Sequence, residues 1–221
     1  MIITAFTTVT DRGSVALLKE NLLVDERQLN GALKHARDLI PTIDELLNSN
    51  GLSFNDVDLL CVDVGPGSYT GMRVGIATAK GLQFASGKPV AGVCSLEAMA
   101  YSASRACTGT IVPVIDAKWK QLYFGIFRSA GGKHTIEKKC DVATADEIVR
   151  RIPKDSIICG NIDSPYKHLF RRFTFLPSEF HYPCARDIGT LGIHKFRKSC
   201  AEPLEPIYLR PSEAEKNKFV Q

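Results

Sequence analysis

The sequence lacks the features that would place the protein in a membrane, outside the cell or around a metal. No apolar run approaches 18 residues, and the start has no basic segment leading into an apolar one. The seven cysteines form no C-x-x-C pair, and no two histidines lie four residues apart. We therefore expect a cytoplasmic protein with buried, reduced thiols, no metal site and no membrane contact.

The charge of +4 is divided unevenly along the 221 residues. Residues 1–108 carry a net −2, and residues 109–221 carry a net +6. A basic second half allows a weak electrostatic contribution to nucleic-acid contact, although a solvated surface is the commoner explanation.

One stretch, residues 59–86, combines three local patterns. Leu59–Val64 is a short apolar run that predicts a strand buried on both faces. The following segment, 65–71, holds three glycines and a proline, which predicts a sharp turn. From Met72 to Ser86 the residues favour a helix, whose first amide groups would face the turn.

The glycine-rich turn has two interpretations. It could hold an anion at the helix N-terminus, where backbone amides and the helix dipole favour negative charge. However, Met72 and Arg73 stand where a Walker loop has Lys and Ser/Thr, and Thr70 stands where a dinucleotide motif has its third glycine. A tight strand-to-helix turn is the alternative. The residues of the candidate anion loop are Gly65, Gly67, Ser68, Thr70 and Gly71.

The predicted helix carries small residues at a spacing of four. One row is Gly71, Gly75 and Ala79, and the other is Ala77, Gly81 and Ala85. Such rows let another backbone approach closely. Glycine inside a helix costs up to about 1 kcal/mol relative to alanine, and close packing would offset that cost. The packing could be internal or against a partner.

The remaining pattern predicts two α/β lobes, 1–108 and 109–221. In the first lobe we expect strands at Ile2–Phe6, Ser14–Leu18, Leu22–Val24 and Val90–Val93. We also expect a helix over Asn30–Ser49, which Pro41 kinks or restarts. A further helix should run from Ser95, as its cap, to Ala106. In the second we expect strands at Ile111–Ile115, Leu122–Phe127 and Ile157–Cys159, a helix opened by the Thr144–Glu147 capping box, and a helix from Asp187, as its cap, to Lys198. Meander strands followed by crossovers predict mixed sheets flanked by helices.

Several segments resemble the TsaB (YeaZ) family. The glycine signature, Gly65 to Leu82, carries most of the resemblance. His35–Pro41, Ser95–Glu97, Ile115–Lys118 with Tyr123, and Pro206–Arg210 support it in the same order along the chain.

The resemblance implies a two-lobed actin/sugar kinase/Hsp70 (ASKHA) fold and a role in making N6-threonylcarbamoyladenosine at position 37 of tRNA. It implies an accessory subunit of the transferase TsaD, joined by the ATPase TsaE, that also homodimerises through the same N-lobe surface and meets tRNA through the complex. No cofactor is implied for the chain alone; whether ATP or ADP at the complex interface touches it stays open, as does the surface that faces tRNA.

The resemblance and the helix patterns together predict an interface with a partner protein, and they predict no catalytic residue. The predicted interface residues are Leu33, Arg37, Ile40, Met72, Arg73, Gly75, Ile76, Ala79 and Lys80. Thr7 stands where members of the family carry an acid, and the metal-binding H-x-x-x-H pair of the catalytic paralogues is absent. Asp63 and Asp116 could be hydrogen-bonding or ligand residues. The alternative function is an autonomous ATPase or peptidase of the same fold, although no nucleophile with a base is visible.

Overall fold

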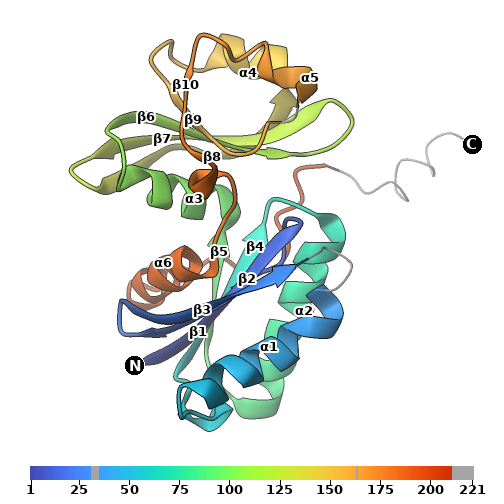
Figure 1. Ribbon diagram of the computed structural model, residues 1–221, viewed down its shortest axis with the longest axis vertical. Helices are drawn as coiled ribbons and strands as arrows, with labels where there is room; N and C mark the ends of the chain where they lie inside the picture. Colours follow the sequence, from blue (N-terminus) through green and yellow to red (C-terminus); the bar gives the residue numbers. More distant parts are fainter. Residues whose placement is uncertain (31–34, 163, 211–221) are drawn as a thin grey trace, which may run out of the picture.

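The computed structural model describes residues 1–30, 35–162 and 164–210, and it consists of two stacked lobes, each built on a five-stranded sheet (Figure 1). Helix α3 and the segment that returns from the second lobe to helix α6 connect the lobes, and the segment after α6 contacts both. Among the helices of these residues, none is long and apolar enough to cross a membrane.

The first sheet has the strand order β3-β2-β1-β4-β5. Its strands are β1 (Ile2–Thr7), β2 (Arg12–Lys19), β3 (Leu22–Asn30), β4 (Leu59–Gly65) and β5 (Val90–Cys94). The first three form an antiparallel meander, whereas β1, β4 and β5 run parallel. The predicted meander followed by crossovers is therefore confirmed, with β3 extending well beyond Val24.

Helices cover both faces of the first sheet. On one face lie α1 (His35–Ser49) and α2 (Tyr69–Ser86), with Phe6, Leu39 and Ile76 in the shared core. On the other face lies α6 (Ala185–Arg197), which buries Ile188 against Ile3 and Cys61. The sheet is thus buried on both sides, as the apolar Leu59–Val64 pattern predicts.

The second sheet has the order β10-β9-β6-β7-β8. Its strands are β6 (Gly109–Asp116), β7 (Gln121–Ala130), β8 (Lys133–Thr144), β9 (Ile157–Cys159) and β10 (Thr174–Phe175). On one face lie α4 (Ala145–Arg151) and the short α5 (Ser164–Lys167), and on the other lies α3 (Ser95–Ser104). Two 3-10 turns, η2 (Phe54–Asp56) and η3 (Ser178–Phe180), complete the described structure.

The predicted start of the first helix is wrong, because Asn30 belongs to β3 rather than opening α1. Pro41 lies within α1, which excludes a new helix at this residue and leaves the predicted kink as the alternative. Strand β8 was missed altogether. It is the edge strand of its sheet, and residues 133–139 are mostly polar and exposed, so no apolar alternation marks it.

Helix capping shows where local rules hold and where tertiary contacts override them. Thr144 and Glu147 form the predicted capping box of α4. Ser95 and Asp187, in contrast, lie inside the first turns of α3 and α6, whose N-caps are Cys94 and Cys184. Both side chains bond to distant partners instead: Ser95 donates to Asp63, and Asp187 accepts from Arg105.

A division between residues 108 and 109 separates the two sheets, but helix packing crosses it. Helix α3 packs on β6, β7 and β8 of the second sheet, whereas α6 packs on β1, β2, β4 and β5 of the first. The two helices also contact each other. The lobes therefore exchange helices, and α3 against α6 forms the junction between them.

A buried ionic network fastens this junction. Lys195 Nζ of α6 lies 2.9 Å from Glu97 Oε2 of α3 and 3.4 Å from Glu202 Oε1. His134 Nε2 on β8 lies 3.6 Å from Glu97 Oε1, and Lys139 pairs with Glu202. Burial raises the pKa of Glu97, but His134 and Lys195 outweigh it and hold that pKa below its ordinary value.

We expect Lys195→Met to destabilise the protein by about 3 kcal/mol, because removing one partner leaves the Glu97 carboxylate buried with less compensation. Lys198→Met, on the exposed end of the same helix, should change the free energy of unfolding by less than about 0.5 kcal/mol. Urea denaturation of both variants measures the difference. Equal stability of the two variants would show that the network contributes little.

Candidate functional site

The glycine-rich turn between β4 and α2 is a closed structural turn. Helix α2 begins at Tyr69 rather than at Met72, because Ser68 caps it: the Gly71 amide donates to Ser68 Oγ at 3.2 Å. The chain enters the turn through a cis Gly65–Pro66 peptide bond.

The glycines of the turn lie against the end of β1. A Cβ atom on Gly71 would lie 2.0 Å from the Thr8 carbonyl oxygen, and one on Gly67 would lie 2.5 Å from the Val9 carbonyl oxygen. Thr8 Oγ1 donates to the Gly71 carbonyl at 2.7 Å. Close approach of this backbone therefore accounts for both glycines without a ligand.

Several amides of the candidate anion loop already have partners inside the chain. The Gly65 amide donates to Asp63 Oδ1 at 2.9 Å, and the Ser68 amide donates to the Val9 carbonyl at 2.6 Å. The Gly71 amide donates to Ser68 Oγ at the N-cap of α2. The Asp63 carboxyl group directly below the turn would repel an anion when it is ionised. The geometry favours the tight-turn interpretation, and an anion site at Gly65, Gly67, Ser68, Thr70 and Gly71 stays a prediction.

Asp63 is fully buried and receives three hydrogen bonds at the carboxyl end of β4. The donors are Thr7 Oγ1 at 2.8 Å, Ser95 Oγ at 2.5 Å and the Gly65 amide. Burial raises the pKa of the Asp63 carboxyl from 3.8 to about 6, and the three donors partly offset it. The Thr7 hydroxyl donates a hydrogen bond to the Asp63 carboxylate, whereas an acidic side chain at position 7 would repel it.

The two small-residue rows of α2 have different environments. Gly71, Gly75 and Ala79 are buried against the chain's own sheet, and a Cβ on Gly75 would meet Thr8 Oγ1 at 2.7 Å. Ala77, Gly81 and Ala85 are exposed, and among residues 1–30, 35–162 and 164–210 no atom lies within 4 Å of a Cβ placed on Gly81. The first row is therefore internal packing, and the second faces outward.

Four of the predicted interface residues are buried inside the first lobe. They are Met72, Gly75, Ile76 and Ala79, and their contact with a partner stays a prediction. The alternation of small and apolar residues did not reveal which face of the helix meets the sheet.

The other predicted interface residues lie on the surface, except for one outside the described residues. Arg37, Ile40, Arg73 and Lys80 are exposed, whereas Leu33 falls in the segment 31–34. Their contact with a partner stays a prediction. Sequence reasoning missed Phe84, which is 93% exposed. Its position next to Ala85 and three residues after Gly81, both in the exposed small-residue row, was the available signal. We call Ile40, Ala77, Lys80, Gly81 and Phe84 the outer helical face.

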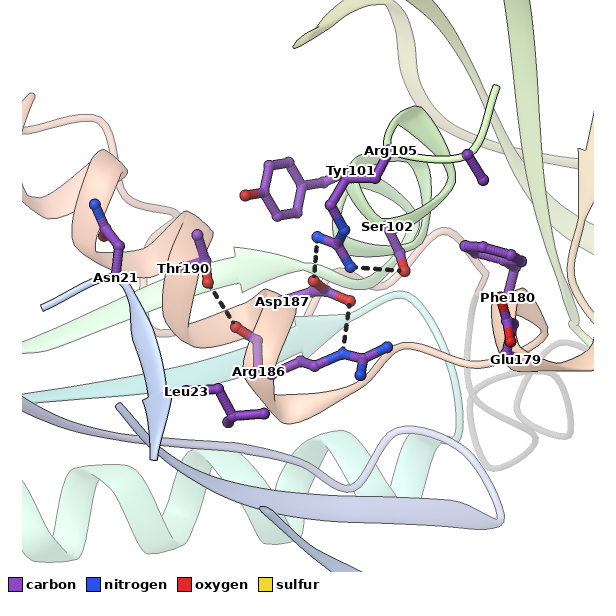
Figure 2. Close-up of a pocket in the computed structure, with 11 residues that line it drawn as sticks. Asn21, Leu23, Tyr101, Ser102, Arg105, Glu179, Phe180, Arg186, Asp187 and Thr190 are labelled. Atoms are coloured by element: carbon purple, nitrogen blue, oxygen red, sulfur yellow. Dashed lines mark hydrogen bonds and ion pairs between the residues drawn. The ribbon is translucent and has the colours of Figure 1, made fainter. Parts of the chain in front are cut away.

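A cavity of about 510 Å³ lies between the ends of α3, α6 and η3, away from every predicted site residue (Figure 2). Arg105 Nη1 lies 2.7 Å from Asp187 Oδ1, and Cys184 Sγ donates to Asp187 Oδ2 at 2.7 Å. Arg186 Nε lies 3.8 Å from the same Oδ2. Burial lowers the pKa of Arg105, but Asp187 outweighs it and raises that pKa. Arg105 at the end of α3 thus pairs with Asp187 of α6 across the junction of the two helices, and these charged residues have a structural role.

The described residues contain no group of three or more His, Cys, Asp or Glu side chains arranged to hold a metal ion. Asp116 accepts hydrogen bonds from the Lys118 amide at 2.8 Å and from Lys118 Nζ at 2.7 Å. Its carboxylate therefore stabilises the turn between β6 and β7, which is the structural alternative for this residue.

The pKa of Asp63 predicts a pH-dependent stability. Because folding raises this pKa, the folded state binds the proton more tightly, so the contribution is present below about pH 4 and is lost as pH rises through about 6. A shift of this size corresponds to about 3 kcal/mol. Asp63→Asn cannot titrate, so the stability of the wild-type protein relative to Asp63→Asn should fall by about that amount between pH 4 and 7. Denaturant titrations at several pH values measure it, and a pH-independent difference would contradict it.

The two glycine environments predict opposite effects of alanine. Gly71→Ala should destabilise the protein by about 2 kcal/mol or more, because its Cβ would overlap the Thr8 carbonyl. Gly81→Ala should stabilise it by up to about 1 kcal/mol, because no described residue lies within 4 Å of the added Cβ and alanine favours the helix. Thermal unfolding of both variants measures this; destabilisation by Gly81→Ala would contradict the assignment of an open outer face.

Comparisons with the sequences of known proteins identify the family of this chain. The family model described as "TsaD: tRNA N6-adenosine threonylcarbamoyltransferase" matches residues 30–184. The chain is 29% identical to the "tRNA threonylcarbamoyladenosine biosynthesis protein TsaB" of Bacillus subtilis, covering 97% of this chain and 96% of the relative. It is 26% identical to the protein of that name from Escherichia coli, with the same coverage.

A solved structure confirms the fold. "YeaZ from Pseudomonas aeruginosa" is 25% identical and superposes with a TM-score of 0.80, covering 94% of this chain and 99% of that one. The two-lobed ASKHA architecture expected from the resemblance is thereby confirmed. The chain belongs to the family that the threonylcarbamoyltransferase model describes, and within it to the TsaB (YeaZ) proteins.

Proposed function

We propose that this chain is a non-catalytic accessory subunit in the synthesis of N6-threonylcarbamoyladenosine in tRNA, paired with a TsaD-type paralogue. The names of its full-length relatives support the pathway, and the match to a TsaD family model supports a partner of related fold. Paralogues of one fold commonly pair through equivalent surfaces, so the partner would present a similar helix pair.

The observation that carries the proposal is the outer helical face. Gly81 lies on the exposed side of α2, and no atom of the described residues lies within 4 Å of a Cβ placed on it. A glycine there costs helix stability, and within the described part of the chain no contact with a Cβ at this position would offset the cost. Backbone-to-backbone approach by a partner helix would offset it. Phe84 and Ile40, 93% and 54% exposed, add apolar area that a partner would bury.

The same face serves a second copy of this chain in the absence of the paralogue. Heterodimer and homodimer would then compete for one surface, so a variant that weakens one should weaken the other. Arg37 and Lys80, exposed on α1 and α2, would contribute charge to either contact.

The closed turn supports an accessory rather than an enzymatic role. Asp63 is fully engaged by its three donors, one of which is Thr7 at the position where the family carries an acid. We therefore propose that nucleotide, tRNA and a TsaE-type ATPase act on the assembled complex, with any ATP or ADP at its interface. Autonomous ATPase or peptidase activity is the alternative, and ATP or peptide hydrolysis by the purified chain would favour it.

The pathway assignment is tested by depleting the protein and measuring tRNA nucleosides by mass spectrometry. We expect threonylcarbamoyladenosine to fall strongly and to recover when the wild-type chain is restored. Unchanged levels of the modified nucleoside after depletion would refute the pathway.

The interface is tested by two matched truncations. Phe84→Ala should weaken co-purification with the TsaD-type partner by about tenfold or more, because it removes an exposed aromatic from the proposed contact. Phe196→Ala, on α6 across the sheet, should leave binding unchanged. Gly81→Arg should block close approach while the helix remains folded. Normal binding by both Phe84→Ala and Gly81→Arg would exclude this face.

A further inference from the structure

The turn between β6 and β7 has an unusual backbone. Lys118, Trp119 and Lys120 all adopt positive φ angles, of 62°, 55° and 62°. None is glycine, so each is in a conformation that L-residues avoid. Such backbone persists only when its surroundings hold it, and it occurs preferentially where a side chain must be presented in one orientation.

The surroundings do hold this turn. The Ala117 amide donates to the Gln121 carbonyl and the Gln121 amide to the Lys118 carbonyl, both at 3.0 Å. Asp116 accepts from the Lys118 amide at 2.8 Å. From the far end of the chain, Arg210 Nη1 donates to the carbonyls of Ala117 and Lys118. The turn is therefore fixed on both sides, by its own strands and by the C-terminal segment.

What the turn presents is an aromatic ring between two cations. Trp119 is 68% exposed, and Lys118 and Lys120 are exposed on either side of it. The Trp119 indole does not pack in the core, although large apolar side chains usually stabilise a fold by being buried. Lys118 also pairs with Asp116, so Lys120 is the better placed of the two for an outside anion.

A second aromatic group lies near this turn. Tyr69 and Tyr208 stack with ring centroids 4.6 Å apart, and the Arg73 guanidinium lies 4.1 Å above the Tyr69 ring. Tyr208 lies two residues before Arg210, whose side chain bonds to the turn. One ring of the stacked pair therefore belongs to the same segment that holds the turn.

This chemistry fits unpaired RNA. Bases of single-stranded loops stack on exposed aromatic rings, and nearby Lys or Arg side chains contact the phosphates. The net charge of +6 on residues 109–221 has the sign that such a contact needs. A lipid surface also accepts Trp and Lys, but the clamped turn presents a single ring rather than a broad apolar face, which favours stacking.

We propose that the Lys118–Lys120 turn is an RNA contact of this chain, in which an unpaired base of tRNA stacks on Trp119 and Lys120 meets a neighbouring phosphate. The choice of tRNA rests on the proposed function; the stacking itself rests on the turn.

The sequence offers a direct readout, because Trp119 is its single tryptophan. An unmodified tRNA transcript titrated into the full chain should quench the tryptophan emission, with an affinity that falls as salt rises. Trp119→Ala should weaken binding of the transcript about tenfold in a filter assay, and Trp119→Phe should retain part of it. Lys120→Gln should weaken binding and reduce the salt dependence by about one phosphate contact.

Phe196→Ala is the matched control, because Phe196 is an exposed aromatic residue of α6 outside both proposed contacts, and its RNA affinity should equal that of the wild-type chain. Absence of quenching, or equal affinities of Trp119→Ala and the wild-type chain, would overturn the proposal. So would a blue shift with anionic phosphatidylserine vesicles but no response to RNA, which would indicate a membrane contact.

The outcome is separable from that of the proposed function. Quenching by the transcript with undiminished threonylcarbamoyladenosine after depletion would refute the pathway and support the contact. Loss of the modified nucleoside after depletion, with full RNA affinity in Trp119→Ala, would support the pathway and refute the contact.

Discussion

The hydrogen bonds of the buried Asp63 carboxyl group join three segments at the carboxyl end of β4, and the positions of α2 and α3 depend on them. They join the end of β1 through Thr7, the start of the glycine turn through Gly65, and the first turn of α3 through Ser95. One carboxyl group thereby connects the first sheet, the helix that faces outward and the helix that leads to the second lobe. Because it is fully buried, an unsatisfied donor or acceptor there would carry a large desolvation cost, so the three segments are constrained together.

This constraint determines what α2 can do. With the turn closed against Thr8 and Val9, the glycines serve close packing, and the helix presents only its outer row to the surroundings. The proposed partner contact therefore lies on the outer helical face rather than on the loop. The same arrangement separates the two proposed contacts: a protein partner on the helices of the first lobe, and RNA on the β6–β7 turn of the second.

The junction between the lobes is polar as well as apolar. Lys195 and Glu97 meet within it, and Arg105 pairs with Asp187 beside the cavity at its edge. Since α3 and α6 each pack on the sheet of the other segment of the chain, neither lobe is completed by contiguous sequence. The α3–α6 junction thus sets the orientation of the two proposed contact surfaces. Removing one partner of its buried Lys195–Glu97 pair would leave a charge buried without compensation, which is costly.

Local patterns in the sequence determined the strands of the first sheet, the glycine turn, the α4 capping box and the family, because these depend on residues near one another in the chain. Only the tertiary structure decided that Ser95 and Asp187 bond to distant partners rather than capping helices, since a cap competes with whatever the fold brings within reach. It likewise decided which small-residue row of α2 is buried, because spacing gives two equivalent faces and the sheet selects one. Phe84 and Trp119 gain their meaning in the same way: an aromatic residue is ordinary in a sequence and becomes informative only when the fold leaves it exposed.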